Sequence, residues 1–379
     1  MKKIHLEPSS TFSSLYLHFP FCETKCHYCD FYSLAASRTQ EKDKDRFAQA
    51  LKNEVILWLD SISSLETIFL GGGTPSMTAP STIEWIFESL LKENKIHETT
   101  EWNMEVNPSS VDIKSLTHLG KLGVNRISMG VQSMNPVELK ILGRVHDPKQ
   151  VHSALESIIK SGIPEISVDV ICGVPGQTLQ SLEKTLKVLT KYPITHLSCY
   201  LLTLPSHHRM AKDLPNDDTQ LEHLLFINDF LQNIGFEHYE ISNFCRNSKK
   251  AQHNMNYWKG KSYLGLGPSA HSYDPRTQTR WKNYSSIHRY ADFIEKNEFP
   301  IEWTEALTPS QVELEKWLLA LRLNEGFPYA WLEKKAQKQK AEQFLRENLL
   351  EIHPDDSNRL RPTPRGYALN DLLIQSLST

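Results

Sequence analysis

The sequence predicts an α/β fold: a partial (β/α)6 barrel whose parallel sheet stays incomplete, followed by a small C-terminal helical, winged-helix-like domain. Three observations lead to this. Short apolar runs alternate with amphipathic stretches over more than half of the 379 residues, polar or glycine-rich segments follow the apolar runs, and helical periodicity replaces the alternation near the C-terminus. The length suits one large domain and a smaller one.

The first half of the chain supplies the strands and helices of the barrel. The strands are predicted from short apolar runs bounded by polar residues, and the helices from apolar side chains spaced three or four apart. In chain order we expect strands at 15–18, 67–70, 103–106, 126–129, 166–170 and 196–201, and helices at 46–59, 82–92, 113–122, 148–160 and 179–190.

The pattern changes after Pro205. A helix at 220–234, a strand at 236–241 and an aromatic-rich and glycine-rich region precede helices at 311–323, 329–335 and 341–348, a hairpin of 349–353 and 359–362, and a terminal helix at 365–377. The predicted divisions are an N-terminal tail (1–14), a barrel (15–205), a barrel-completing segment (206–289) and the C-terminal domain (290–379).

Composition narrows the functional classes. The formal net charge of -3 and the mixed charges of the C-terminal segment do not favour a nucleic-acid partner. We expect a soluble cytoplasmic protein, because we find no signal-peptide pattern and no apolar run of about 18 residues. Cytosolic thiols are kept reduced, so the single cysteines Cys172, Cys199 and Cys245 are expected to pack in the core.

Cys22, Cys26 and Cys29 stand at C-x3-C-x2-C spacing directly after the first predicted strand. Three thiolates are one short of the four protein ligands of a structural zinc site or a fully ligated four-iron cluster. The triplet therefore predicts a metal centre with an open position. Two alternatives are a zinc site completed by His27 or a distant residue, and a loop that binds no metal.

Polar groups recur after the later strands. Gly71-Gly72-Gly73-Thr74-Pro75 follows the second strand, where glycines let the backbone approach a ligand and expose amide donors; a tight turn is the alternative. Functional groups of such sheets gather at the carboxyl ends of the strands. The candidates there are Glu105, Gln132 and Asp169, each of which could instead cap a helix or satisfy a buried hydrogen bond, and Arg144, which could pair with a carboxylate or be a solvated loop cation.

These motifs, in this order, resemble the radical S-adenosylmethionine proteins and, over nearly the whole chain, the oxygen-independent coproporphyrinogen III oxidase-like family with its heme chaperone branch. The resemblance implies a [4Fe-4S] cluster on Cys22, Cys26 and Cys29, with S-adenosylmethionine on the open iron. It also implies that Gly72, Gly73 and Thr74 hold the amino group of that cofactor. Its other implied contacts are Tyr16, Tyr28, Glu105, Gln132, Arg144 and Asp169.

Two features bear on the branch. The resemblance implies that the oxidases of this family have four cysteines at C-x3-C-x2-C-x-C spacing and an N-terminal extension before them. In this chain Phe31 stands at the position of their fourth cysteine. The segment from His253 to Trp258 matches the H-N-x-x-Y-W motif of the chaperones. An imidazole can ligate heme iron and Tyr257 and Trp258 could stack on a porphyrin; alternatively, His253 caps a loop and the rings fill the core.

We therefore predict a heme chaperone that binds heme as cargo and transfers it to an acceptor protein. An electron donor and a homodimer are further expectations, and productive radical formation stays open. The alternatives are a coproporphyrinogen III oxidase, which decarboxylates propionate side chains, and a nucleic-acid-modifying radical enzyme. His271, in the glycine-rich segment, is interpreted as polar lining or packing.

Overall fold

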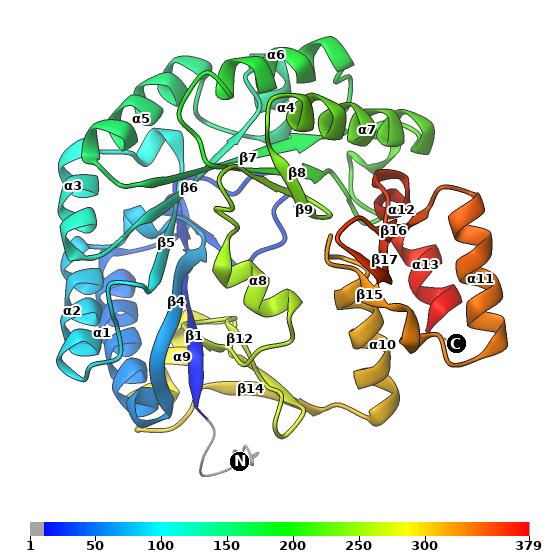
Figure 1. The fold of residues 1–379 in the computed structure, drawn as a ribbon. Helices are drawn as coiled ribbons and strands as arrows, with labels where there is room; N and C mark the ends of the chain where they lie inside the picture. The colour runs from blue at the N-terminus through cyan, green and yellow to red at the C-terminus, as the bar shows by residue number, and fades with distance from the viewer. Residues whose placement is uncertain (1–10, 379) are drawn as a thin grey trace.

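The computed structural model describes residues 11–378 (Figure 1). Residues 1–10 of the predicted tail lie outside the described residues. The predicted end of that tail at Ser14 is too late, because the first strand already begins at Phe12.

The central element is a nine-stranded sheet in the order β11-β1-β4-β5-β6-β7-β8-β10-β9. Its six middle strands are parallel, as expected for successive βα units, and they confirm the predicted α/β fold class. β11 continues the parallel arrangement beside β1, while β10 and β9 are antiparallel to their neighbours. The strands are β1 (Phe12–Phe19), β4 (Ile62–Gly72), β5 (Glu101–Val106), β6 (Arg126–Gln132), β7 (Glu165–Cys172), β8 (His196–Leu201), β9 (Glu237–Glu240), β10 (Asn243–Cys245) and β11 (Leu264–Leu266).

Helices cover the outer face of this sheet (Figure 1). Their apolar stripes pack on the strands in one large hydrophobic core that includes Leu51, Ile86, Leu155 and Leu186. All five helices predicted between the strands are present, and the sequence reading missed a short sixth, α4. The six helices between the strands are α1 (Glu41–Trp58), α2 (Pro80–Lys92), α3 (Ile113–Leu122), α4 (Pro136–Leu142), α5 (Pro148–Ser161) and α6 (Leu179–Leu189), and α7 (Asp217–Asn233) follows the strand β8.

A second, three-stranded sheet stands beside β11 and corrects one expectation. It contains β12 (His271–Asp274), β13 (Thr279–Asn283) and β14 (Ile301–Ala306), with α9 (Ile287–Ile294) between the last two. Between Tyr290 and the hairpin at 349–353 the sequence predicted helices alone, but β14 lies in this stretch and pairs with β13. The predicted boundary at 290 therefore falls inside α9.

The C-terminal elements have a hydrophobic core of their own, which includes Trp317, Phe327, Phe344 and Leu373. The predicted hairpin is present, but only Tyr329–Trp331 of the helix expected at 329–335 forms, as a 3-10 turn, and the terminal helix is interrupted at Leu369. The elements are α10 (Pro309–Ala320), β15 (Phe327–Pro328), α11 (Lys335–Arg346), β16 (Leu350–His353), β17 (Asp356–Pro362), α12 (Pro364–Ala368) and α13 (Asn370–Leu377). The winged-helix assignment stays a prediction.

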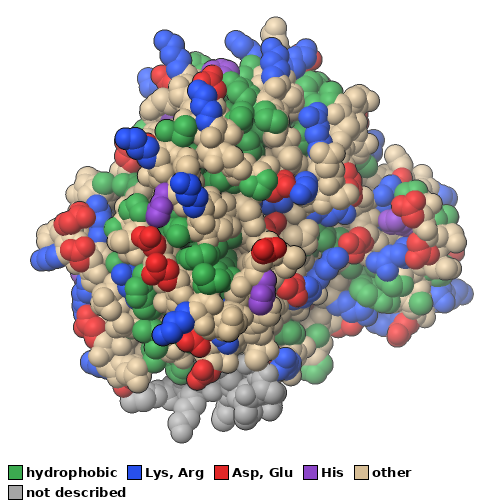
Figure 2. All heavy atoms as spheres, turned by 60° about the vertical axis from the view of Figure 1, so that its left-hand side comes forward, with side chains coloured by type: hydrophobic (Ala, Val, Ile, Leu, Met, Phe, Trp, Pro, Cys, Tyr) green, Lys and Arg blue, Asp and Glu red, His purple; other side chains and the backbone are tan. Residues whose placement is uncertain are grey.

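Within residues 11–378, no helix is both long and apolar enough to cross a membrane. On the face shown in Figure 2, basic and acidic side chains are interspersed.

Candidate functional site

The cysteine loop lies at the carboxyl end of β1. Its start is fixed by the short parallel pair β2 (Phe21–Cys22) and β3 (Leu34–Ala35). All three thiols are half-buried. The guanidinium of Arg144 donates a hydrogen bond to Cys26 Sγ (3.4 Å), and Thr74 Oγ1 donates to Cys22 Sγ (3.8 Å). Burial raises the pKa of the Cys22 and Cys29 thiols, so proton loss there needs a cationic partner such as a metal.

The arrangement differs from that of a single-ion site. Among the residues that the structure describes, no group of three or more His, Cys, Asp or Glu side chains gathers around one point that could hold a metal ion. A cluster that takes one thiolate on each of three irons spreads its ligands over a larger body and does not need that convergence. His27 is directed elsewhere, since its Nδ1 donates to the carbonyl oxygen of Ile141 (3.0 Å). The three thiols beside the Arg144 cation fit an anionic cluster.

The glycine loop also corrects an expectation. Its amides are not free to meet a ligand: the N–H of Gly73 donates to Phe19 O (2.7 Å), and that of Thr74 donates to Phe21 O (2.7 Å). The loop thereby holds the start of the cysteine loop. A Cβ on Gly73 would lie 2.6 Å from the carbonyl oxygen of Phe21, so this close approach requires glycine. A ligand at this loop would meet carbonyl oxygens, which suit an ammonium group.

Two buried carboxyl groups come from β5 and β7, the strands on either side of β6, and hydrogen bonds and charges offset only part of the cost of their burial. Glu105, on β5, accepts a hydrogen bond from the N–H of Gly72 (3.1 Å), but burial, and then the nearby Asp169, raise its pKa to about 8. Burial raises the pKa of Asp169 to about 6, against the opposing effects of Ser198 and Arg144. Carboxyl groups held in this way would be stabilised as carboxylates by a positively charged ligand.

Arg144 and its neighbours complete this region. The guanidinium donates to Gly130 O (2.7 Å) and, in a short contact, to Asn107 Oδ1. Gln132, at the end of β6, has a positive φ of 67°, and its amide nitrogen would be 2.9 Å from a Cβ placed on Gly130. Burial raises the pKa of the Tyr28 hydroxyl, and the nearby positive charge of Arg144 offsets only part of this effect. The predicted polar residues from separate strands therefore do converge.

Sequence reasoning missed Asn107. Its Nδ2 donates to Thr74 Oγ1 (2.7 Å) while its Oδ1 accepts from Arg144, so it links the glycine loop to the cation. The available signal was its position directly after β5, two residues beyond Glu105. Tyr200, which is exposed at the end of β8 and lines the cavity described next, was also missed.

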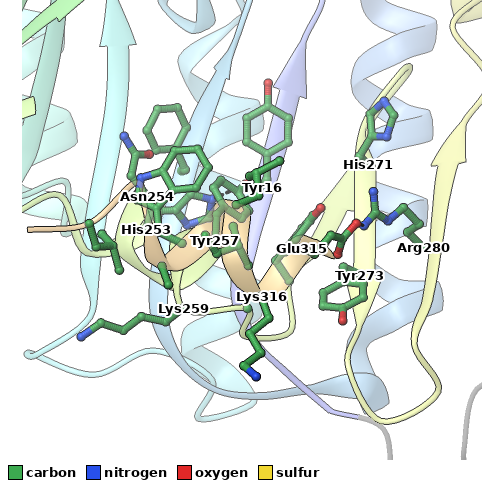
Figure 3. Close-up of a pocket in the computed structure, with 18 of the residues that line it drawn as sticks. Tyr16, His253, Asn254, Tyr257, Lys259, His271, Tyr273, Arg280, Glu315 and Lys316 are labelled. Carbon is green, nitrogen blue, oxygen red and sulfur yellow. Dashed lines mark hydrogen bonds and ion pairs between the residues drawn. The ribbon is translucent and has the colours of Figure 1, made fainter. Parts of the chain in front are cut away.

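A cavity of ≈ 1180 Å³ extends from this mouth to the C-terminal elements. At one end lie Tyr16, Gly72 and Glu105, with the helix α8 (Gln252–Trp258) beside Tyr16; at the other end lies α10. Figure 3 shows side chains from both ends. The volume exceeds the roughly 300–1,000 Å³ of ordinary small-molecule pockets. Aromatic rings dominate the lining: Tyr16, Phe31, Tyr32, Phe69, Tyr200, Tyr257, Trp258, Tyr263, Tyr273 and Trp331.

The H-N-x-x-Y-W motif forms α8 rather than a loop. His253 is buried, and both of its ring nitrogens are hydrogen-bonded, Nδ1 with Thr67 Oγ1 (2.8 Å) and Nε2 with Tyr257 OH (2.7 Å). Burial lowers the pKa of His253 to about 3, so the ring is neutral. In this conformation His253 holds α8 against β4 and offers no free nitrogen to iron, whereas Tyr257 and Trp258 reach the cavity.

A family model matches part of this chain, and curated relatives match most of it. The model of the radical SAM superfamily matches residues 16–189. The heme chaperone HemW of Mycobacterium tuberculosis is 31% identical over 372 residues, 96% of this chain and 94% of the relative. HemW of Bacillus subtilis is 32% identical over 323 residues, 83% and 84% of the two chains.

Among solved structures, coproporphyrinogen III oxidase (HemN) from Escherichia coli matches with a TM-score of 0.82 over 98% of this chain and 91% of that chain. At 21% identity, this likeness is one of fold.

Proposed function

We infer the function from the family: the chain belongs to the heme chaperone family within the radical SAM superfamily. Its main task is to bind heme and to transfer it to an acceptor protein. Its cofactors are a [4Fe-4S] cluster and S-adenosylmethionine, which together supply one-electron chemistry when bound.

The observation that supports the proposal most directly is the continuity of the aromatic cavity with the polar mouth. Cys22, Cys26 and Cys29 would hold the cluster beside Arg144. Tyr16, Tyr28 and the polar groups Glu105, Gln132 and Asp169 would surround S-adenosylmethionine.

We assign its ammonium group to Glu105 and the carbonyl oxygens of the loop Gly72, Gly73 and Thr74, because a cation relieves the cost of ionising the buried carboxyl group.

The part of the cavity between α8 and α10 would hold heme. A porphyrin has two extended apolar faces, which suit the rings of Tyr257 and Trp258 on α8 and the exposed Leu318 on α10. His253 would act as a positioning residue, since its Nε2 holds the Tyr257 hydroxyl. A cytoplasmic location, an electron donor, a homodimer and the lack of a nucleic-acid partner remain parts of this proposal.

The oxidase alternative has a weaker basis. HemN shares the fold at 21% identity, whereas HemW of Mycobacterium tuberculosis and HemW of Bacillus subtilis match 96% and 83% of this chain at 31% and 32% identity. Phe31, at the position of the fourth cysteine of the oxidases, is 64% exposed and lines the cavity, where its ring adds apolar surface.

An anaerobic titration tests the proposal. The cluster-reconstituted protein is titrated with heme and followed by absorbance, with electron paramagnetic resonance of the cluster in parallel. We expect saturation at one heme per chain with the cluster intact. Unsaturable, weak heme uptake equal to that of an unrelated protein would contradict the proposal.

A further inference from the structure

Three histidines line the cavity: His18, His253 and His271. Two of them have both ring nitrogens engaged. His18 Nε2 donates to Tyr32 O (2.9 Å) and its Nδ1 bonds to Tyr16 OH (3.0 Å), while His253 is held by Thr67 and Tyr257. If either ring bound iron, a buried polar partner would lose its hydrogen bond, which is unfavourable in an apolar setting.

His271 differs from both. It is exposed at the start of β12, and no hydrogen bond to its ring nitrogens occurs within the described part of the chain. Its ring meets Trp303 edge-on, with 6.1 Å between the centroids. Partial burial and the charges of Lys282 and Arg280 lower the pKa of His271, which keeps the imidazole neutral, the form that binds a metal.

We propose that His271 is the iron ligand of heme in this cavity. The inference rests on the proposed function and concerns which residue takes the iron. Figure 3 shows His271 projecting from β12 on one side of the cavity, with Tyr257 on α8 on another side. A macrocycle ligated through His271 would face an aromatic wall, since the rings of Tyr257 and Tyr263 meet edge-on at 4.5 Å.

The charged groups around the same space suit the two propionates of heme. Arg280, on β13, and Lys316, on α10, both line the cavity. Their present partners are carboxylates on α10: Arg280 pairs with Glu315 in a short contact, and Lys316 with Glu313 (3.3 Å). These pairs are partly exposed, so exchanging one carboxylate partner for a propionate costs little.

The test compares three single variants of the cluster-reconstituted full chain by anaerobic titration with heme. His271→Ala removes the proposed ligand, His253→Ala removes the hydrogen-bonded histidine, and His288→Ala is the control on the exposed face of α9. Binding is followed by the absorbance of the heme complex and by electron paramagnetic resonance of the ferric iron. Free imidazole is then added to each complex.

We expect His271→Ala to weaken heme binding at least tenfold and to lose the spectrum of histidine ligation, which added imidazole restores. His288→Ala should keep the wild-type affinity and spectrum, whereas His253→Ala, which releases the Tyr257 hydroxyl, should weaken binding but keep the spectrum of histidine ligation. Wild-type spectrum and affinity in His271→Ala would overturn the inference alone, because the wild type would still bind heme. Absence of stoichiometric binding by the wild type would instead overturn the proposed function.

Discussion

Glu105 provides a quantitative test of the cofactor site. Its pKa of about 8 in the ligand-free protein means that the side chain is mostly a neutral acid at pH 7. With that pKa, only about a tenth of the molecules carry the carboxylate at pH 7. A bound ammonium group would favour the carboxylate, so binding of S-adenosylmethionine should release close to one proton from this group.

The size and the sign of the pH effect on S-adenosylmethionine affinity follow from the linkage between binding and the ionisation of Glu105. Ionising Glu105 at pH 7 costs about 1.4 kcal/mol, the equivalent of one pH unit below its pKa. Because the bound state carries fewer protons, the affinity rises with pH, by close to tenfold between pH 6 and 7, and stops rising from this cause above about pH 8. Asp169 is largely ionised already at pH 7, since its pKa is about 6.

Isothermal titration calorimetry of the cluster-loaded protein at pH 7, in buffers with different ionisation enthalpies, counts the protons. The matched variant is Glu105→Gln, which keeps the size of the side chain and loses its titration. We expect the wild type to release about 0.9 proton more than the variant and to bind more tightly. Equal proton release by the two proteins would refute the assignment of Glu105 as the partner of the cofactor's cation.

Three further predictions concern the fold and the cluster. Burial raises the pKa of Glu54 to about 7 against hydrogen bonds from Tyr290, Gly267 and Asn283, so the folded state binds its proton more tightly than the unfolded chain. The unfolding free energy should therefore fall by about 3 kcal/mol as the pH rises from 4.5 through 7, and denaturant unfolding of Glu54→Gln should lack this fall. A lysine at position 144 cannot reproduce the contacts of Arg144 to Asn107, Gly130 and Cys26, so Arg144→Lys should retain less iron and sulfide per chain than the wild type. The control is Arg365→Lys at an exposed position, and equal iron and sulfide content in the two variants would contradict the role of Arg144. Trp317→Ala leaves a cavity in the C-terminal core and should lower the unfolding free energy of these elements by about 3–5 kcal/mol, so that a protease cleaves within 309–378 earlier than in the wild type. Leu318 is exposed, so Leu318→Ala should be cleaved no faster than the wild type.

Much of the barrel could be predicted because its strands and helices have strong local patterns. The run His196–Leu201 and the helix Ile113–Leu122 have the predicted bounds, since turns and caps flank both. β14 was missed because its exposed and half-buried residues give no clear alternation, and its pairing with β13 is a long-range property. The break at Leu369 was missed as well, because neither proline nor glycine occupies that position.

At the site, the sequence identified the convergent residues but not their partners. The engaged amides of Gly73 and Thr74, and the bond between His253 and Thr67, depend on contacts with β1, β2 and β4 that no local motif reveals. For the same reason, His271 could not be distinguished from packing until its neighbours were known.

Whether this chain carries heme or makes its precursor can be decided in one sample. Cluster-loaded protein with S-adenosylmethionine and a reductant is given equal amounts of heme and coproporphyrinogen III under anaerobic conditions, and the products are followed by mass spectrometry. The account predicts one heme retained per chain and unchanged coproporphyrinogen III. Loss of carbon dioxide from its propionate side chains, with no heme retained, would contradict it.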